Sequence, residues 1–142
     1  MSNNVLDKTD VTLLGAGCAS LSLASRANEL EDYDFTVIDP ETHLAQDHIW
    51  GFWQMPWLSA AVLISRKKWY NWKIITTDKA VLHTTEAFPY SAINRNDWIS
   101  DCFEKAIDNN VKFKRELTKE YSSQVLDSRP PKIPKDNMLQ HF

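Results

Sequence analysis

One stretch near the N-terminus constrains the fold of this chain more than any other. The apolar residues 11–14 form a run typical of a strand buried on both faces, and Gly15 and Gly17 follow it without a spacer. A second apolar run, residues 35–38, ends at Asp39. Between the two runs, apolar side chains recur at the spacing of one helix face, at Cys18, Leu21, Leu23, Ala24, Ala27 and Leu30. This order predicts strand, glycine turn, helix, strand and acidic stop.

The predicted order suits the chemistry of phosphate binding. Gly15 permits a tight turn, Gly17 lets backbone approach a pyrophosphate, and the start of a helix offers unpaired N–H groups to an anion. Asp39 follows Gly15 by 24 residues, near the spacing of about 20 expected for an acid that binds a ribose. The dinucleotide contacts predicted here are Gly15, Ala16, Gly17, Cys18, Ala19, Ser20 and Asp39.

Ser20 stands where the motif G-x-G-x-x-G has its third glycine. Serine is small, so close packing of the helix on the strand stays feasible without being assured. The plain alternative is a strand-helix-strand unit that binds no nucleotide. The predicted fold class is α/β, with a Rossmann-like dinucleotide-binding unit.

Size and composition exclude several classes of function. A length of 142 residues predicts one domain. The net charge of −3, mixed in sign along the chain, gives no electrostatic basis for binding nucleic acid. Cys18 and Cys102 form neither a disulfide framework nor a CxxC site, so the cytoplasm is the simplest compartment. No apolar run suits a signal peptide or a spanning helix, and any membrane contact is predicted to be peripheral.

Tryptophan is unusually dense in the middle of the chain. Five of the six tryptophans lie within 23 positions, at Trp50, Trp53, Trp57, Trp69 and Trp72. Core packing is the usual reason, because a buried indole removes a large apolar area from water. The alternative is a pocket for a large apolar or flat ligand. In the aromatic loop that we expect after Asp39, Gly51 would let backbone approach a flat ring.

The middle of the chain is predicted to contain one short helix and a hairpin. The helix covers residues 57–65, and strands at 69–75 and 80–84 are joined by a turn at 77–79, separate from the nucleotide-binding sheet. Residues 40–46 are predicted as loop. His43, Asp47 and His48 match no standard metal-ligand spacing, so no metal site is predicted.

A second, longer helix is predicted to follow residues 89–94, with Asn94 or Asn96 as its N-cap. Its apolar stripe would contain Trp98, Ile99, Cys102, Phe103, Ala106 and Ile107. The helix is expected to end at residues 109–110. Short strands are predicted at residues 111–114 and 125–127.

Four stretches together resemble the FAD-dependent lycopene cyclases of bacterial type, which close the ionone rings of carotenoids. They are residues 15–23 at the phosphate turn, 47–53 around Trp-Gly-Phe-Trp, 125–129 and 138–142. The first is shared by many flavoproteins, whereas Trp-x-Phe-Trp together with the closing Leu-Gln-His-Phe is much more specific. The resemblance extends from residue 10 to the end of the sequence.

The resemblance implies FAD in its reduced form, with NAD(P)H as reductant, and lycopene, an apolar polyene, as substrate. It adds Trp50 and Phe52 to the cofactor contacts. The implied reaction is an isomerisation without net electron transfer, in which the flavin stabilises a carbocation as a nearby negative charge. Members of the family are much longer than this chain, and their glutamate-rich catalytic segment has no counterpart in it. No catalytic residue is therefore assigned.

Residues 1–142 are accordingly predicted to be the N-terminal part of a flavoprotein dinucleotide-binding domain, truncated, with a small antiparallel β region inserted after its first unit. The chain alone is expected to be inactive. A second hypothesis is part of an FAD-dependent monooxygenase or other flavin oxidoreductase, and a third is a non-catalytic nucleotide-binding or interaction domain. The predicted location is the cytoplasm, with peripheral contact at the inner face of the membrane left open.

Overall fold

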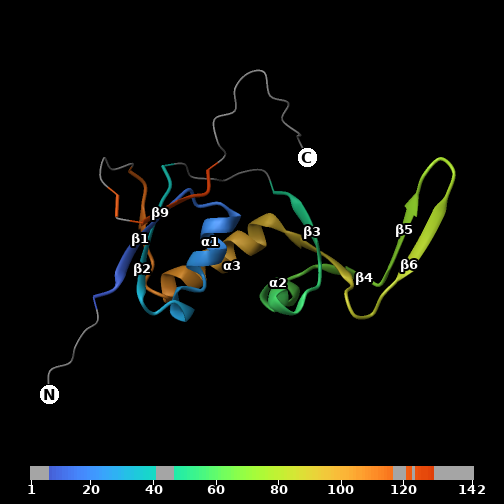
Figure 1. Ribbon diagram of the computed structural model, residues 1–142, viewed down its shortest axis with the longest axis horizontal. Coiled ribbons are helices and arrows are strands. Elements are labelled where there is room, and N and C mark those ends of the chain that lie inside the picture. Colours follow the sequence, from blue (N-terminus) through green and yellow to red (C-terminus); the bar gives the residue numbers. More distant parts are fainter. Residues whose placement is uncertain (1–6, 41–46, 117–120, 123, 130–142) are drawn as a thin grey trace, which may run out of the picture. The chain divides into compact units, whose positions relative to one another are not determined.

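The computed structural model describes residues 7–40, 47–116, 121–122 and 124–129, and the chain divides into two compact units (Figure 1). The first unit comprises residues 1–42 and 106–142, and the second comprises residues 43–105. Residues 41–46 of the loop predicted at 40–46, which include His43, and residues 138–142 lie outside the described residues.

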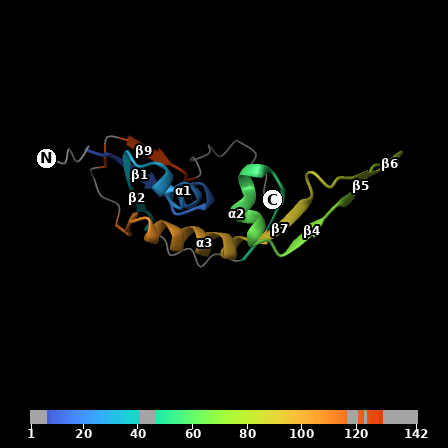
Figure 2. The ribbon, with the colours of Figure 1, turned by 90° about the horizontal axis from the view of Figure 1, so that it is seen from below.

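The first unit is built on a sheet of four parallel strands in the order β8-β2-β1-β9 (Figure 2). The strands are β1 (Thr9–Leu14), β2 (Tyr33–Ile38), β8 (Lys112–Lys114) and β9 (Gln124–Asp127). This is the 3-2-1-4 order with which a doubly wound dinucleotide-binding sheet begins. All four predicted strands are therefore present, and the α/β prediction is confirmed.

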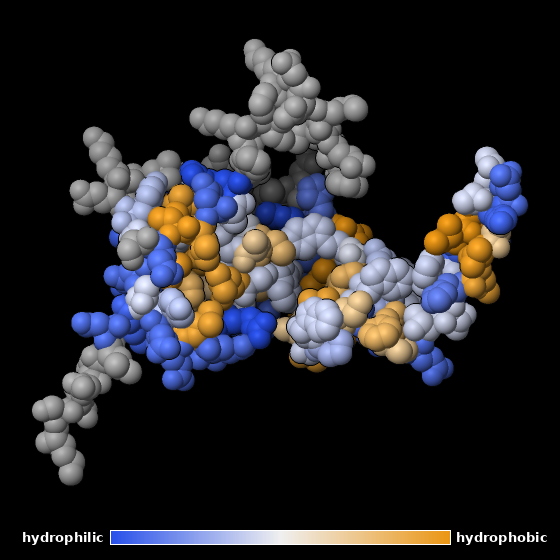
Figure 3. Space-filling model, in the orientation of Figure 1, coloured by the Kyte–Doolittle hydropathy of each residue, from blue (hydrophilic) through white to orange (hydrophobic). Residues whose placement is uncertain are grey.

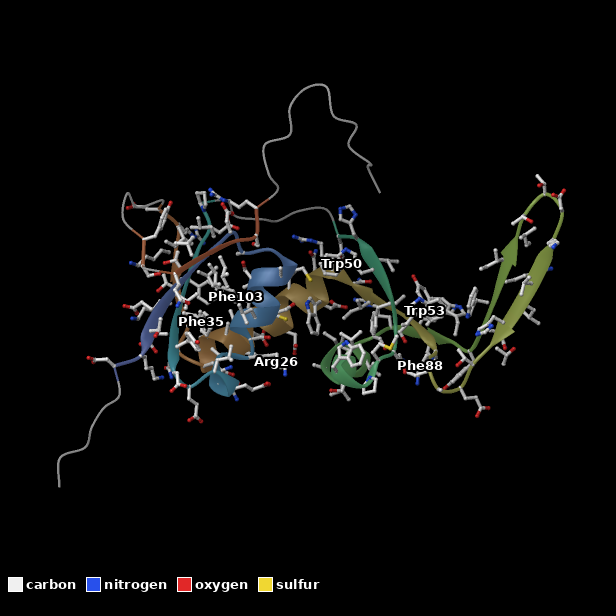
Figure 4. The ribbon with its side chains drawn as sticks, viewed as in Figure 1. Arg26, Phe35, Trp50, Trp53, Phe88 and Phe103 are labelled. Atoms are coloured by element: carbon white, nitrogen blue, oxygen red, sulfur yellow. The ribbon has the colours of Figure 1, made fainter. Side chains whose placement is uncertain are left out.

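The core of the first unit lies on one face of β1 and β2. Alternate strand residues point to this face, as a period of two requires. They pack with Ala24 of α1 (Cys18–Ala24) and Ala106 near the end of α3 (Arg95–Asp108). The buried members of this core are Val11, Leu13, Ala24, Phe35 (Figure 4), Val37, Ala106 and Val111.

Helix α1 is shorter than the sequence pattern predicted. It ends at Ala24, and a separate 3-10 turn follows at Ala27–Glu29. The Ser25 hydroxyl donates to the Ser22 carbonyl at 2.9 Å, and the Arg26 N–H donates to the Leu23 carbonyl at 3.0 Å. These local bonds compete with a continuing α-helix. The prediction of one helix as far as Leu30 was wrong for that reason.

The first turn of α3 is capped from a distance. The Asp47 carboxylate accepts from the Asn96 backbone N–H and from the Asn94 side-chain amide, both at 3.1 Å. A carboxylate at a helix start satisfies an otherwise unpaired donor and complements the helix dipole. The capping side chain was predicted to be that of Asn94 or Asn96. The side chain that accepts a backbone hydrogen bond from the first turn is instead that of Asp47.

The predicted apolar stripe of α3 is only partly buried. Cys102 and Ala106 are fully buried, whereas Phe103 and Ile107 are 43% and 49% exposed. Trp98 and Ile99 are half-buried. The helix ends at Asp108, next to Asn109 and then Asn110 with φ of +60°, so the predicted end is confirmed.

The described part of the second unit contains a three-stranded antiparallel sheet, a separate two-stranded hairpin, one short helix and residues 95–105 of α3. The sheet has the order β3-β7-β4, and the hairpin pairs β5 with β6. The bounds are β3 (Ile49–Trp53), β4 (Lys67–Trp69), β5 (Asn71–Ile75), β6 (Ala80–Thr84), β7 (Tyr90–Asn94), a 3-10 turn at Pro56–Leu58 and α2 (Ser59–Leu63). The inserted antiparallel region, the short helix and the separate hairpin are confirmed.

Two local predictions in this unit were wrong. The expected aromatic loop is strand β3, and the strand predicted at 69–75 is interrupted at Tyr70. Residues 90–94 lead into the long helix as predicted, and they form strand β7. β3 and β7 pair with each other, a contact between distant residues that local patterns do not contain. A side chain at Gly51 would overlap the phenol ring of Tyr90. The flat ring that approaches the backbone of Gly51 is therefore that of Tyr90, where a ligand ring was predicted.

Replacing Leu13 with alanine should lower the free energy of unfolding by about 2 to 5 kcal/mol, since this side chain is 1% exposed and its loss leaves a cavity. Leu126→Ala is the matched control, because Leu126 is 52% exposed on the neighbouring strand β9 and should cost no more than about 0.5 kcal/mol. Urea unfolding followed by circular dichroism measures both. Equal losses would contradict the position assigned to this core.

Candidate functional site

The glycine turn lies where the strand order of the sheet reverses. β1 pairs with β2, the next strand in sequence, on one side and with β9 on the other. Ligands of open α/β sheets bind at such a switch point, outside the carboxyl ends of the strands. The turn after Leu14 occupies that place in the first unit.

Gly15 needs to be glycine for two reasons. Its φ of +91° is a conformation that side chains rarely adopt. A Cβ atom there would also lie 3.1 Å from Cγ of Arg129 and 3.2 Å from Oγ of Ser128. The tight turn expected at this position is therefore present.

Gly17 is glycine for a different reason. Its φ of −82° and ψ of −174° are ordinary extended values, and apart from its chain neighbours no described residue has an atom within 4 Å of a Cβ built on it. The chain itself makes no use of the missing side chain. The space above Gly17 is open to a ligand, next to the exposed residues Cys18 and Ala19.

Asp39 and the turn are brought together across the sheet. Oδ2 of Asp39 accepts from the Ala16 backbone N–H at 2.6 Å, and the Asp39 backbone N–H donates to the Lys114 carbonyl at 3.0 Å. The turn therefore already holds one carboxylate with a backbone donor. A ligand anion at the Ala16 N–H would have to displace the Asp39 carboxylate. The displaced carboxylate could then accept a hydrogen bond from a ribose hydroxyl.

Ser20 joins α1 to the segment after β9. It is 3% exposed, and its hydroxyl lies 2.8 Å from the hydroxyl of Ser128. Ser128 in turn donates from Oγ and from its backbone N–H to the Leu14 carbonyl, both at 3.0 Å. Since a hydroxyl has one proton to donate, Ser20 is the donor to Ser128. Serine thus replaces the third glycine with a hydrogen bond in the closely packed interior.

Arg129 is the cation beside the turn. Its Nε and Nη2 donate to the two carboxylate oxygens of Asp127 at 2.8 and 2.6 Å. Hydrogen bonding by Arg129 lowers the pKa of Asp127 to about 2, and Asp127 raises that of Arg129, with a smaller charge effect from Asp39. The pair favours the folded state above the ordinary pKa of the carboxyl, and this contribution is lost as the pH falls toward 2.

Ser128 and Arg129 were not among the predicted site residues, although both lie in a stretch that carried the family resemblance. Their only sequence signal is a position directly after a predicted strand, β9, which ends at Asp127. The hydrogen bonds of Ser128 to Ser20 and Leu14 join residues more than 100 positions apart. Only the pairing of β9 with β1 brings Ser128 and Arg129 to the turn.

Trp50 and Phe52 belong to the second unit, on strand β3. Both are half-buried, and the guanidinium of Arg95 lies 6.0 Å from the centre of the Trp50 ring. Their assignment to the flavin stays a prediction. The structure brings together the other seven predicted residues, from Gly15 to Ser20 with Asp39, in the first unit.

Two cavities of the first unit lie away from the turn. One of about 320 Å³ is bounded by residues that include Ala27, Tyr33 and Val111, and another of about 270 Å³ by residues that include Thr12 and Ser122. Neither is lined by the glycines of the turn.

Comparison with known proteins identifies the family. The family described as lycopene cyclase protein matches residues 10–129. The chain belongs to the lycopene cyclase family. No curated protein matches it. The match ends at Arg129, so it covers both the glycine turn and the segment that Ser20 holds against it.

Solved structures show the same Rossmann-like fold at low identity. The peptidyl tryptophan dihydroxylase QhpG has a TM-score of 0.60 and 14% identity, over 89% of this chain and 33% of its own. The tetrameric form of 2-methyl-3-hydroxypyridine-5-carboxylic acid oxygenase has a TM-score of 0.58 and 14% identity, over 75% of this chain and 31% of its own. CtdE, solved with FAD and a substrate, has a TM-score of 0.56 and 18% identity, over 75% of this chain and 30% of its own. This chain spans about a third of the length of these proteins.

Alanine should destabilise the fold at Gly15 and have little effect on stability at Gly17. Gly15→Ala should lower the free energy of unfolding by about 1 to 3 kcal/mol, because it forces a side chain to positive φ against Arg129 and Ser128. Gly17→Ala should change it by no more than about 0.5 kcal/mol, because its conformation is ordinary and its surroundings are empty. Urea midpoints compare the two. A larger loss at Gly17 would show that the turn has another conformation.

Proposed function

We propose that this chain is the FAD-binding part of a lycopene cyclase and that FAD binds at the glycine turn of the first unit. The observation that carries the proposal is the meeting of the Asp39 carboxylate and the Ala16 N–H at a positive-φ glycine, at the switch point of the sheet, in a chain of this family. CtdE, which shares the fold, was solved with FAD.

Each residue of the turn has a distinct role in this proposal. The open space over Gly17 admits the pyrophosphate, and Asp39 accepts from the ribose. The Ser20 hydrogen bond to Ser128 holds the end of β9 against α1, which fixes the shape of the turn. Reduced flavin, when bound, supplies a fixed negative charge that favours a nearby carbocation, and NAD(P)H is the proposed reductant.

The proposed substrate is lycopene, through the family to which the chain belongs. Ring closure is an isomerisation in which a proton adds to a terminal double bond, the cation is captured within the molecule, and another proton leaves. The adding proton needs an acid held in a dry pocket. Glu86 and Glu104 are exposed, and Asp97 is bonded to Arg66 at 2.8 to 2.9 Å. None of these three carboxyls has the required setting.

The oxygenase structures support the fold of this chain rather than an oxygenase activity. Their identities are all below 20%, whereas the lycopene cyclase family matches most of the sequence. No helix among the described residues is long and apolar enough to cross a membrane. We propose a cytoplasmic location with peripheral contact at a membrane, where an apolar polyene would dissolve.

FAD added to the purified chain should bind, with quenching of flavin fluorescence. Gly17→Val should weaken binding more than about 10-fold, a cost above 1.4 kcal/mol, because its side chain would fill the open space above Gly17 that the pyrophosphate is proposed to occupy. Asp39→Ala should weaken it about 10- to 100-fold through the lost ribose bond. Ala80→Val, on the exposed strand β6, is the control and should bind like the parent. Unchanged binding by Asp39→Ala would remove the ribose assignment.

Expressed alone in cells that accumulate lycopene, the 142-residue chain should produce no cyclic carotenoid, because the described carboxyls lack a dry pocket. Extracted pigments separated by chromatography measure this against cells with an empty vector. β-Carotene or γ-carotene above that background would assign the acid to one of the carboxyls present, and Glu86→Gln, Asp97→Asn and Glu104→Gln would identify which.

A further inference from the structure

The β5–β6 hairpin of the second unit has two different faces. On one face, Trp72 packs against Trp53 at 5.2 Å and against His83 at 4.8 Å between ring centres. The other face, which we call the outer face, carries Lys73 paired with Leu82 and Ile75 paired with Ala80. Ile75 is 70% exposed and Leu82 67%, more than the aliphatic residues of the Trp72 face.

The outer face has no packing partner among the described residues. All five residues of β6 are exposed, and Trp72 is the only half-buried residue of β5. Figure 3 shows apolar surface on this hairpin. An isolated two-stranded hairpin is marginally stable in water, and contiguous exposed apolar surface marks an interaction site. The outer face therefore fits a partner that accepts aliphatic side chains.

The charge around the hairpin indicates the kind of partner. Residues 49–94 contain five basic and two acidic side chains, a net charge of +3 in a chain whose net charge is −3. The basic residues are Arg66, Lys67, Lys68, Lys73 and Lys79. Arg66 pairs with Asp97, whereas none of the four lysines forms an ion pair with a described carboxylate. The partner is therefore anionic as well as apolar.

Aromatic side chains accompany two of these lysines just before the hairpin. Nζ of Lys67 lies 5.4 Å from the centre of the Trp69 ring, and Nζ of Lys68 lies 5.6 Å from that of Tyr70. Trp69 is 38% exposed and Tyr70 is 45% exposed. Tryptophan and tyrosine beside lysine are typical of the boundary between lipid and water.

We propose that the outer face of the β5–β6 hairpin docks on the surface of an anionic lipid bilayer. Ile75 and Leu82 enter the boundary of the acyl chains, while Lys73 and Lys79 reach the phosphate groups. The turn between the strands is polar, with Thr76 bonded to Lys79, and it contains Asp78. The hairpin consequently lies along the headgroups rather than crossing them.

A second copy of the chain fits this surface less well than lipid does. Two copies that joined through their outer faces would oppose the same lysines to each other, and like charges across an interface are unfavourable. The inference deepens the proposed function, because a polyene substrate would reach the protein from lipid. Only this link to the substrate rests on the proposed function. Its test contains no flavin, so FAD binding and membrane docking succeed or fail separately.

The test is flotation of the full 142-residue chain with vesicles of phosphatidylcholine alone or mixed with phosphatidylglycerol. The parent should bind the mixed vesicles and be released by salt. Lys73→Gln with Lys79→Gln should weaken binding about 10- to 30-fold, from roughly 1 kcal/mol per lysine. Lys112→Gln with Lys114→Gln makes the same charge change on exposed positions of β8 and should stay within about two-fold of the parent.

A second pair of variants tests the apolar contribution. Ile75→Ser with Leu82→Ser should also lose binding, whereas Val125→Ser with Leu126→Ser, exposed on β9, should not. Acyl chains that carry bromine should quench the tryptophan emission of the parent more than that of the lysine variant. Equal binding to phosphatidylcholine alone, or equal losses in the β8 controls, would overturn the proposal. Dimers that dissociate in Ile75→Ser with Leu82→Ser, without vesicle binding, would assign the surface to a second copy.

Discussion

The backbone conformation of Gly15 is the constraint on which the candidate site depends. A φ of +91° turns the chain away from the end of β1 within one residue and presents the Ala16 N–H to Asp39 on the neighbouring strand. The same turn leaves room at Gly15 for the side chains of Ser128 and Arg129, which arrive from β9 on the other side. The ends of three strands thus meet at Gly15. A side chain at this position would collide with the residues that follow the third strand, β9.

Local periodicity was sufficient to predict the elements whose packing partners are close in sequence. β1, the start of α1 and β2 follow from a period change within 30 residues, and the β5–β6 hairpin follows from its turn. Local hydrogen bonds explain the early end of α1, but the wrong predictions for β3, Gly51 and the start of α3 share another cause, since each feature depends on a distant partner. β3 needs β7, Gly51 needs the Tyr90 ring, and α3 needs the Asp47 carboxylate. The glycine turn was predictable, but the hydrogen bond from Ser20 to Ser128 was not.

The two units differ in the kind of surface that they offer a ligand. At the turn of the first unit, backbone N–H groups and short side chains provide directional hydrogen bonds, which suit a phosphate and a ribose. The hairpin of the second unit offers exposed aliphatic groups and lysines, which bind without fixed geometry. The proposed lycopene cyclase function would use both kinds of surface, one for the polar dinucleotide and one for the membrane that holds the apolar polyene, and this chain builds them on different sheets.

The electrostatics of the described carboxyls explain why this part of the chain suits binding rather than proton donation. Glu29 and Asp127 are each held by an arginine, and in both cases the arginine lowers the pKa of the carboxyl. A general acid for a polyene needs the opposite shift, which arises when a carboxyl is buried without a positive partner. Asp127 is a counter-ion that holds Arg129 beside the turn. In the proposed ring closure, the proton would therefore come from a carboxyl in a drier setting than Glu29 or Asp127.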